Sequence, residues 1–410
     1  MNSPEDNRIA NRIKTVRNLI ETYTFKVPFH HHFQFHARSN KQWGSSDRRF
    51  YRHACYSLFR LGKAFRDMDF ETKLALGLYL NSDDYRDYIR FLIKEKNIDW
   101  LLDDSVITIQ NKIENIQIHF PEFKLTDIFP ALDEVSDSID KEKFVESIWK
   151  QKRVWLKPAK GLLKEAEVLL EKIHINYTLN ANAIAVANGE NIEPLIKKGL
   201  AQVMDLSSQQ AAAKVTINSG EKIWDCCAGA GGKSLYVANE NEGVNLFASD
   251  LRSTAIDNLL ERFRSMNLKL PFSAVADLEM LPPDLFFTHP GISPVTAGKG
   301  FFDAILMDAP CTGSGTWGRT PEYLPVFKAI DIDEAHNKQF ALASSVLRFL
   351  KPGGKLYYIT CSVYKKENED VVEKLTLIHD LIIESSNLIT NDDADTLFVA
   401  VLKKKIQEEK

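Results

Sequence analysis

Of the residue types in this chain, cysteine limits the possible reactions most. Two of the five cysteines follow similar stretches of sequence. Cys311 follows a short apolar run at 302–307, and Cys361 follows another at 355–359; both runs predict buried strands. In an open parallel sheet, the carboxyl ends of the strands border the crevice that binds ligands. We therefore expect both thiols at one ligand-binding edge, where they could react with a substrate.

Methylation at carbon 5 of cytosine is a reaction that needs such thiols. Attack of a thiolate at carbon 6 makes carbon 5 nucleophilic, and a base must later remove the carbon-5 proton. Asp308 would lie beside ring nitrogen N3, with Cys311 and Cys361 on opposite sides of the carbon edge. Either thiol can attack on this reasoning, because the cysteine that follows proline is the nucleophile in DNA cytosine methylases. Methylation of an exocyclic amine is disfavoured, because its usual motif has an aromatic residue where this chain has Cys311.

A glycine-rich turn follows the predicted strand 222–225 and leads into a helix at 233–239. Glycines there allow close approach of a ligand to backbone amides at a helix amino end. A phosphate-binding P-loop would need glycine at the position of Cys227. A dinucleotide is compatible with Asp250 as the ribose ligand, and S-adenosyl-L-methionine would use Asp250 together with Asp277. The structural alternative is that both carboxylates only cap the turns after their strands.

The order of elements predicts an α/β protein with three domains. Apolar spacing predicts helices at 9–23, 48–61 and 84–93, in an all-helical domain over residues 1–140. A small α+β, RRM-like subdomain is expected over 141–215, and a Rossmann-like, doubly wound parallel sheet over 216–410. The strands expected in that sheet lie at 222–225, 244–250, 272–277, 302–307, 355–359 and 396–402, with helices at 233–239, 253–266, 333–350 and 367–378. The segment 282–300, rich in proline and glycine, is expected to be a long surface loop.

Composition is that of a soluble cytoplasmic protein. No apolar run is long enough to span a bilayer, and the first 17 residues are too polar for a secretory signal. The five cysteines are too few for a disulfide framework and form no CxxC pair, so no metal site is expected. Cys55 and Cys226 are assigned to packing. The cluster of His30, His31, His32 and His36 is assigned to a surface or packing role.

Charge is distributed unevenly along the chain. Residues 1–66 contain 13 Lys or Arg against 4 Asp or Glu, whereas residues 67–150 contain 10 against 19. Cations next to aromatic residues are typical of surfaces that hold phosphates and stack bases. The aromatic residues in question are Phe29, Phe33, Phe35, Trp43, Phe50, Tyr51 and Tyr56. The alternative is that these rings form the core of small helices whose cations are solvated.

A series of motifs in the second half resembles the Sun-type, or Fmu-type, RNA cytosine-5 methyltransferases. The motifs, in order, are 202–209, the turn 227–233, Asp250, Asp277, 308–313, 319–322, 360–362 with 367–368, and 398–402. The resemblance implies that Cys361 is the nucleophile and that Cys311 assists proton removal and product release. It also implies that Lys233 and Asp308 lie near the target base. The implied contacts of S-adenosyl-L-methionine are Cys227, Ala228, Gly229, Ala230, Gly231, Gly232, Lys233, Asp250, Arg252, Asp277 and Asp308.

The chain departs from the family pattern at two places. Ala230 stands where the family has proline, and Ala255 stands where it often has arginine, a role that Arg252 could take. The segment 46–62 resembles the antitermination-factor-type RNA-binding domain of ribosomal members. The resemblance implies an enzyme that forms 5-methylcytosine in 16S ribosomal RNA during rRNA processing, and we expect this enzyme to be a monomer. The alternatives are a transfer-RNA methylase and a non-catalytic RNA-binding or ribosome-assembly factor.

Overall fold

The computed structural model describes residues 3–406 except 82, 83, 95, 97, 104 and 107. The chain divides into two compact units. The first comprises residues 1–135, 139–151 and 317–329, and the second comprises residues 136–138, 152–316 and 330–410. The expected division into three domains at residues 140 and 215 stays a prediction.

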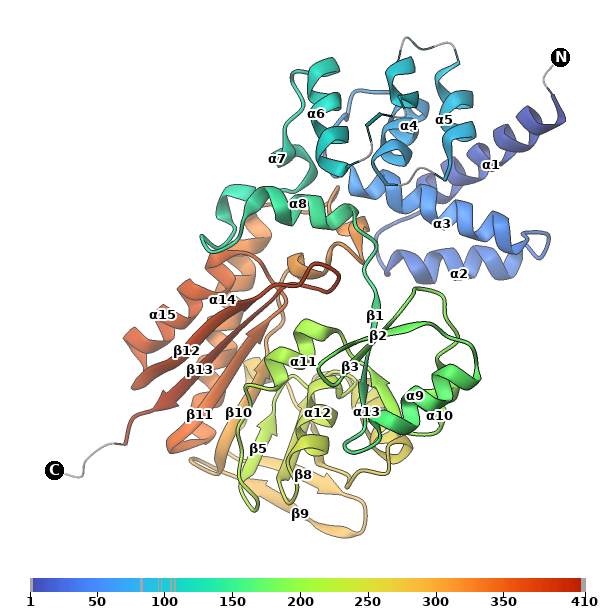
Figure 1. Cartoon of the computed structure of the whole chain (residues 1–410). Coiled ribbons are helices and arrows are strands. Elements are labelled where there is room, and N and C mark those ends of the chain that lie inside the picture. Colours follow the sequence, from blue (N-terminus) through green and yellow to red (C-terminus); the bar gives the residue numbers. More distant parts are fainter. Residues whose placement is uncertain are drawn as a thin grey trace. The chain divides into compact units, whose positions relative to one another are not determined.

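The first unit is helical throughout its described residues (Figure 1). Helix α1 has Ser3 as its N-cap in a capping box, and it buries Ile9, Ile13, Val16 and Leu19 at helical spacing. The helices are α1 (Pro4–Glu21), α2 (Phe29–Ser39), α3 (Ser45–Arg60), α4 (Phe70–Asn81), α5 (Arg86–Ile93), α6 (Ile109–His119), α7 (Leu125–Ile128) and α8 (Lys141–Trp149). The three helices predicted from spacing correspond to α1, α3 and α5.

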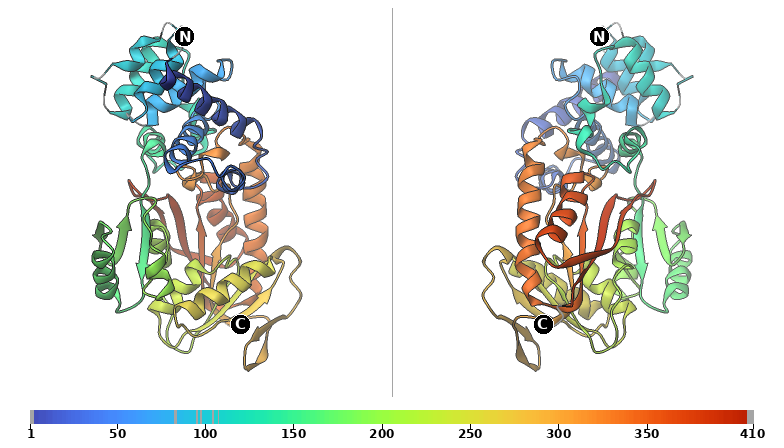
Figure 2. Two further views of the ribbon diagram at one scale, coloured as in Figure 1. Left: turned by 90° about the vertical axis from the view of Figure 1, so that its right-hand side faces the viewer. Right: turned by 90° about the vertical axis from the view of Figure 1, so that its left-hand side faces the viewer.

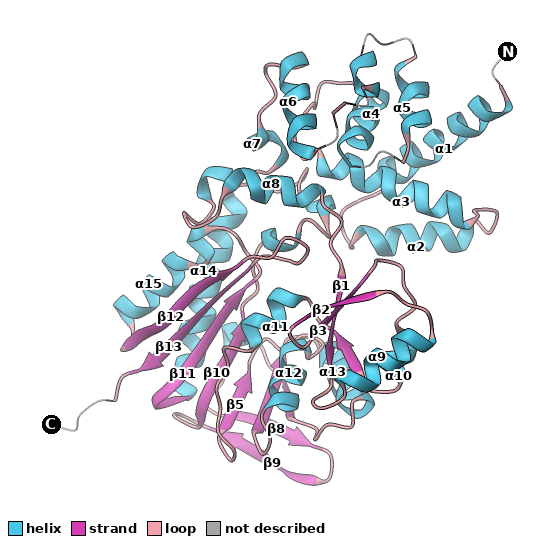
Figure 3. Cartoon of the chain, in the orientation of Figure 1, coloured by secondary structure: helices cyan, strands magenta, loops and turns pink. Residues whose placement is uncertain are grey.

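The second unit is built on a nine-stranded mixed sheet with the strand order β12-β13-β11-β10-β5-β6-β7-β8-β9 (Figure 3). The bounds are β5 (Lys222–Asp225), β6 (Asn245–Asp250), β7 (Phe272–Val275), β8 (Leu285–His289), β9 (Ile292–Ala297), β10 (Phe302–Asp308), β11 (Leu350–Thr360), β12 (Leu381–Ile389) and β13 (Leu397–Lys404). Strands β11, β10, β5, β6 and β7 are parallel neighbours. The remaining pairings are antiparallel, so the sheet is not purely parallel.

Helices cover both faces of this sheet, as a Rossmann-like fold requires. One core contains side chains of α14 (Ile330–Val346) and α15 (Glu369–Ile378), for example Leu342 and Leu375. The other contains side chains of α11 (Leu206–Ala212), α12 (Gly232–Glu240) and α13 (Ser253–Ser265). Trp224, in the middle of β5, is fully buried in the first of these cores. The predicted α/β class is confirmed.

The prediction of a surface loop at 282–300 is wrong, because β8 and β9 form an antiparallel hairpin there (Figure 2). Side chains of the hairpin alternate in burial: Leu285 and Phe287 are buried, whereas Phe286 is exposed. Period-two burial is the pattern of a strand with one covered face. Of the prolines and glycines in this segment, Pro290 and Gly291 form the turn, where Gly291 has φ +80°, and Pro294 lies within β9, an edge strand of the sheet.

A four-stranded antiparallel sheet, in the order β2-β3-β1-β4, precedes the large sheet in the second unit. Its strands are β1 (Val154–Pro158), β2 (Tyr177–Asn180), β3 (Ala183–Val186) and β4 (Ala201–Val203), and α9 (Leu163–Lys172) and α10 (Glu193–Lys197) pack on it. Sequence reasoning missed β4 and α10. Gln202 of β4 links this sheet to α13, because its Oε1 accepts a hydrogen bond from Arg262 at 3.0 Å.

Candidate active site

The two cysteines meet at the carboxyl edge of the large sheet. Strands β10 and β11 are parallel neighbours, with Asp308 in register with Ile359. Cys311 and Cys361 follow these strand ends, and their Sγ atoms lie 3.2 Å apart. The contact with Cys361 and burial together raise the pKa of the Cys311 thiol well above its usual value. The thiols therefore occupy one site, and Cys311 is held in its protonated form.

A lysine and a carboxylate lie beside the thiols. Lys233, near the start of α12, places its Nζ 2.6 Å from Oδ2 of Asp308 at the end of β10. Burial by itself would lower the pKa of Lys233, but the Asp308 carboxylate more than offsets this effect and the pKa is raised. The negative charge available at Cys361 acts in the same direction. Lys233 is thus a fixed positive charge next to the thiol pair.

The turn between β5 and α12 needs glycine at one position in particular. Gly231 has φ +82°, and a Cβ built on it would lie 2.7 Å from Cγ of Leu259. A Cβ on Gly229 or Gly232 would meet nothing within 4 Å, so open space borders the backbone there. The backbone N–H of Ala228 donates to Ser249 O at 2.9 Å and ties the turn to β6. Cys227 and Ala230 complete the turn.

The predicted ribose carboxylate, Asp250, lies at the end of β6 and is 8% exposed. Its Oδ2 accepts a hydrogen bond from the Gly229 N–H at 2.9 Å, which links the second strand end to the glycine-rich turn. Arg252 donates to Oδ1 from its backbone N–H at 3.0 Å and from Nε at 3.1 Å. Asp250 thus keeps acceptor capacity at the edge of the open space above Gly229.

Asp277 lies two residues after β7 and is exposed. Its Oδ1 accepts a hydrogen bond from Glu279 N at 2.9 Å, which makes it the N-cap of the short helix η3 (Leu278–Met280). Asp277 therefore has the capping role that is the structural alternative to ligand binding for Asp250 and Asp277. Because β6 and β7 are paired, with Asp250 in register with Val275, Asp277 still lies at the same sheet edge as Asp250.

Sequence reasoning missed two buried carboxylates of this edge. Asp225, the last residue of β5, is 1% exposed; its Oδ2 accepts from Ser234 Oγ at 2.6 Å, and its Oδ1 has no hydrogen-bond partner among the described residues. Burial raises the pKa of Asp225 to about 7. Glu367, which the sequence offered only as part of a motif, is fully buried. It lies beside the Cys311 turn (residues 310–312) and the Cys361 turn (residues 360–362), which we call the cysteine turns. Nothing in the sequence reveals burial of these two acids.

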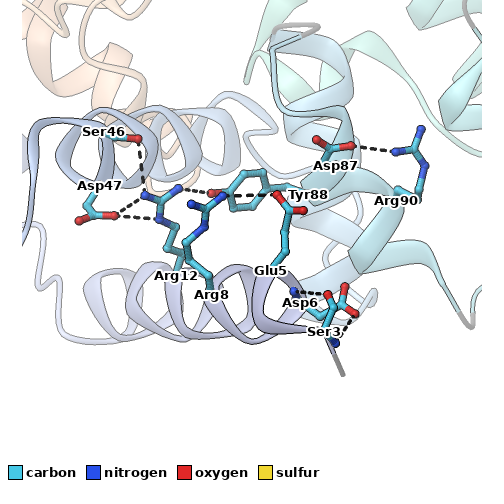
Figure 4. Close-up of polar contacts among 10 residues, drawn as sticks. All are labelled: Ser3, Glu5, Asp6, Arg8, Arg12, Ser46, Asp47, Asp87, Tyr88 and Arg90. Carbon is cyan, nitrogen blue, oxygen red and sulfur yellow. Dashed lines mark hydrogen bonds and ion pairs between the residues drawn. The ribbon is translucent and has the colours of Figure 1, made fainter. Parts of the chain in front are cut away.

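The basic stretch of the helical unit has a different construction. Of its seven aromatic residues only Phe35 is largely exposed, at 68%, and Phe29 and Phe50 are buried. Arg12 of α1 connects helices within the unit: its Nε donates to Asp47 of α3 at 2.8 Å, and it contacts the Tyr88 hydroxyl of α5 (Figure 4). The cations left exposed on α2 and α3 are Arg38, Arg48, Arg49 and Arg52, with Lys41 between the helices. The aromatic residues are therefore mainly core, and the phosphate-binding prediction depends on these cations.

Cys55, Cys226 and two of the clustered histidines have packing contacts. Cys55 and Cys226 are buried, as assigned. The ring centroids of His32 and His36 on α2 lie 4.6 Å apart, and the rings are tilted by 55°. Among the described residues, no group of three or more His, Cys, Asp or Glu side chains could hold a metal ion. None of the helices in the described part of the chain is long and apolar enough to cross a membrane.

The fold and this site define the second unit as a Rossmann-like methyltransferase domain. Its glycine turn, strand-end carboxylates and helix-covered sheet follow the arrangement of S-adenosyl-L-methionine-dependent methyltransferases. The structure of PH0851 matches with a TM-score of 0.69 at 19% identity, over 98% of this chain and 100% of that chain. The structure of NSun6 from Pyrococcus horikoshii with SFG matches with a TM-score of 0.55 at 14% identity, over 67% and 97%. At these identities the likeness concerns the fold.

Residues 212–400 match the model of the family described as 16S rRNA methyltransferase RsmB/F. The resemblance to the Sun-type enzymes is thus confirmed. Ribosomal RNA small subunit methyltransferase B of Shewanella oneidensis is 28% identical over 237 residues, which is 56% of this chain and 52% of the relative. The enzyme of that name from Xylella fastidiosa is 32% identical over 180 residues, 44% of this chain and 40% of the relative. The chain thus spans about half the length, or less, of these relatives.

Proposed function

We propose that this protein is an S-adenosyl-L-methionine-dependent RNA cytosine-5 methyltransferase whose substrate is 16S ribosomal RNA. The observation that carries the proposal is the contact of two thiols, 3.2 Å apart, beside the Lys233–Asp308 pair at a cofactor-binding sheet edge. The family of residues 212–400 and the names of the relatives support ribosomal RNA as the substrate class. We also propose that the protein acts as a cytoplasmic monomer.

The residues of the turn fit S-adenosyl-L-methionine as the cofactor. Asp250 has remaining acceptor capacity for ribose hydroxyls, and the backbone next to Gly229 and Gly232 is open. Oδ1 of Asp225, at the end of β5 where the turn begins, is a buried acceptor without a hydrogen-bond partner in the described part of the chain. Cys227, Ala228, Ala230, Gly231, Arg252 and Asp277 complete the proposed binding set, with Lys233 and Asp308 at its inner end. When bound, S-adenosyl-L-methionine supplies an electrophilic methyl group.

The two thiols divide the reaction between them. The Cys361 thiolate adds to carbon 6, which forms the S–C6 bond and moves the C5=C6 electron pair toward carbon 5. Lys233 and Asp308 hold a proton near N3 and offset the charge that develops on the ring. Once carbon 5 is methylated, loss of its proton re-forms C5=C6 and returns the S–C6 electron pair to Cys361. In this last step Cys311 must be a thiolate, so its own proton leaves to bulk water first; the thiolate then accepts the carbon-5 proton and becomes a thiol again.

The target base must leave its stack to reach these thiols, so an exposed loop or a partly assembled particle is the expected substrate. We assign binding of the RNA phosphate backbone to the four exposed arginines of α2 and α3 together with Lys41 between these helices. The assignment of RNA binding to these cations is independent of the proposed reaction, which would stand even if the cations did not bind RNA.

Trapping of the covalent intermediate tests the assignment. Cys361→Ala should abolish methylation and form no adduct, whereas Cys311→Ala should accumulate a protein–RNA adduct that survives denaturing electrophoresis. Cys55→Ala, which removes a buried thiol of the helical unit, is the control and should behave like the wild type. An adduct that persists in Cys361→Ala would contradict the assignment.

Bisulfite sequencing of RNA from cells that lack the protein identifies the substrate. Loss of one 5-methylcytosine from 16S ribosomal RNA is the expected result. Loss from transfer RNA instead would support the alternative methylase, and loss from neither, together with failure to bind S-adenosyl-L-methionine in calorimetry, would support a non-catalytic factor.

A further inference from the structure

The carboxylate of Glu367 binds both cysteine turns at once. Glu367 ends the short helix η7 (Lys365–Glu367) and is fully buried. Its Oε2 accepts a hydrogen bond from the Thr312 backbone N–H at 2.9 Å, and its Oε1 accepts from the hydroxyls of Thr312 and Ser362, both at 2.5 Å. Thr312 directly follows Cys311, and Ser362 directly follows Cys361. One side chain therefore links the residues next to the two thiols.

Every donor to Glu367 among the described residues is a neutral group. The fourth donor is Gln339 of α14, whose Nε2 lies 2.8 Å from Oε2. Burial of a carboxylate without a cation is costly unless hydrogen bonds satisfy it, and four such bonds do so here. An apolar residue would fill this position without that cost, so packing alone gives no reason for an acid. The negative charge also contributes, after the Cys361 contact and burial, to the raised pKa of Cys311.

The two turns depend on Glu367 to different extents. The Cys361 turn has other anchors: Asn368 Nδ2 donates to Ser362 O at 2.9 Å, and Gly315 N donates to Cys361 O at 2.9 Å. On the Cys311 side, Gln339 Nε2 donates to Pro310 O at 3.1 Å, but the residue after Cys311 is held by Glu367 through both its backbone N–H and its hydroxyl. Loss of the carboxylate should therefore displace Cys311 more than Cys361.

We propose that Glu367 is a positioning residue that holds Cys311 against Cys361 and thereby sets the rate of product release. The inference rests on the proposed function, in which Cys361 attacks and Cys311 assists elimination. It assigns Glu367 no contact with the base or the cofactor. Its loss should leave attack by Cys361 nearly intact and slow the step that needs Cys311.

The test compares Glu367→Gln with the matched variant Glu369→Gln. Glutamine keeps the shape of the side chain but turns an NH₂ group toward the Thr312 N–H or the Ser362 hydroxyl, so at least one acceptor contact is lost. Glu369 lies two residues along the chain and accepts from Ser136 Oγ at 2.9 Å, and among the described residues it makes no hydrogen bond with residues 310–312 or 360–362. In single-turnover reactions with substrate RNA, Glu367→Gln should form the adduct at a rate within about threefold of the wild type, but release it about tenfold or more slowly, as expected for loss of a hydrogen bond to a charged group. Glu369→Gln should match the wild type in both steps.

Equal loss of adduct formation and release in Glu367→Gln, or wild-type release, would overturn the inference. Thr312→Val provides a second variant if Glu367→Gln does not fold, because it removes one hydroxyl donor and keeps the backbone bond; it should slow release in the same direction by a smaller factor.

A measurement without RNA separates failure of this inference from failure of the proposed function. Phenylarsine oxide bridges two neighbouring thiols, so its binding reports the Cys311–Cys361 contact directly. Binding should weaken in Glu367→Gln and not in Glu369→Gln. Unchanged binding would overturn the positioning role even where the enzyme forms adducts. If Cys311→Ala traps no adduct, the proposed function fails, and the inference fails with it.

Discussion

The cysteine edge of the large sheet and the basic stretch of the helical unit are both predicted to meet RNA, and they are built in opposite ways. At the cysteine edge, the reactive groups are partly buried and each has a fixed neighbour: Cys311 with Cys361, and Lys233 with Asp308. In the basic stretch, the aromatic residues are mostly core and the remaining cations are exposed. Precise chemistry requires neighbours that hold a group in place, whereas attraction of phosphates requires charge on the surface.

The largest effect that should follow from the cysteine edge is complete, reversible inactivation by hydrogen peroxide. Two thiols 3.2 Å apart can close a disulfide, in which each loses one hydrogen and peroxide is reduced to two molecules of water. Methylation should fall to background and return after dithiothreitol treatment. Mass spectrometry of digested protein should find the peptides of Cys311 and Cys361 joined. A disulfide that involves Cys227 instead would contradict the thiol geometry.

The next largest effect is expected from Gly231→Ala. The positive φ and the approach to Leu259 make any side chain strained there, at a cost on the order of 1–3 kcal/mol in the free energy of unfolding. Displacement of the turn should also weaken binding of S-adenosyl-L-methionine by about tenfold or more, measured by calorimetry. Gly232→Ala is the matched control, because a Cβ there meets nothing within 4 Å and α12 begins at that residue. Equal destabilisation by both variants would contradict this account of the turn.

At the carboxyl edge of the large sheet, the residues that could be predicted from the sequence are those at the ends of strands. Apolar runs predicted β5 with the bounds that the structure has, and motifs placed Asp250, Asp308 and Cys361 at strand ends. The prolines and glycines of residues 282–300 predict a loop where the β8–β9 hairpin lies. The alternating burial of Leu285, Phe286 and Phe287, which is typical of a strand, is a weaker signal in the sequence. The hydrogen bonds of Glu367 could not be predicted, because three of the four come from Thr312 and Gln339, which are distant in sequence.

A smaller effect should appear in the pH dependence of stability through Asp225. Burial raises the pKa of this carboxyl to about 7, so between about pH 4 and 7 the folded protein keeps a proton that the unfolded chain releases. The contribution of Asp225 to stability therefore falls as pH rises through this window. Asp225→Asn should flatten the decline, seen in urea unfolding at pH 5, 6 and 7.

Asp303→Asn is the control for that measurement. Burial alone would raise the pKa of Asp303, but hydrogen bonds from Lys351 and the Lys222 N–H lower it. Its stabilising contribution is therefore present above the unfolded pKa and is lost only as pH falls toward the lowered value. The control should leave the slope between pH 5 and 7 as in the wild type. An unchanged slope in Asp225→Asn would show that another group titrates there.

The smallest effects are expected from substitution of two arginines in the basic stretch. Arg49 is exposed on α3, whereas Arg12 has a side chain only 15% exposed and binds Asp47. Arg49→Gln should weaken RNA binding by about two- to threefold, reduce the slope of log affinity against log salt by about one, and leave the melting temperature unchanged. Arg12→Gln should lower the melting temperature, because it leaves the Asp47 carboxylate without its cation, and affect the salt slope less. If both variants changed only the melting temperature, the cations of the helical unit would belong to its fold, and RNA binding would have to be sought on the methyltransferase domain.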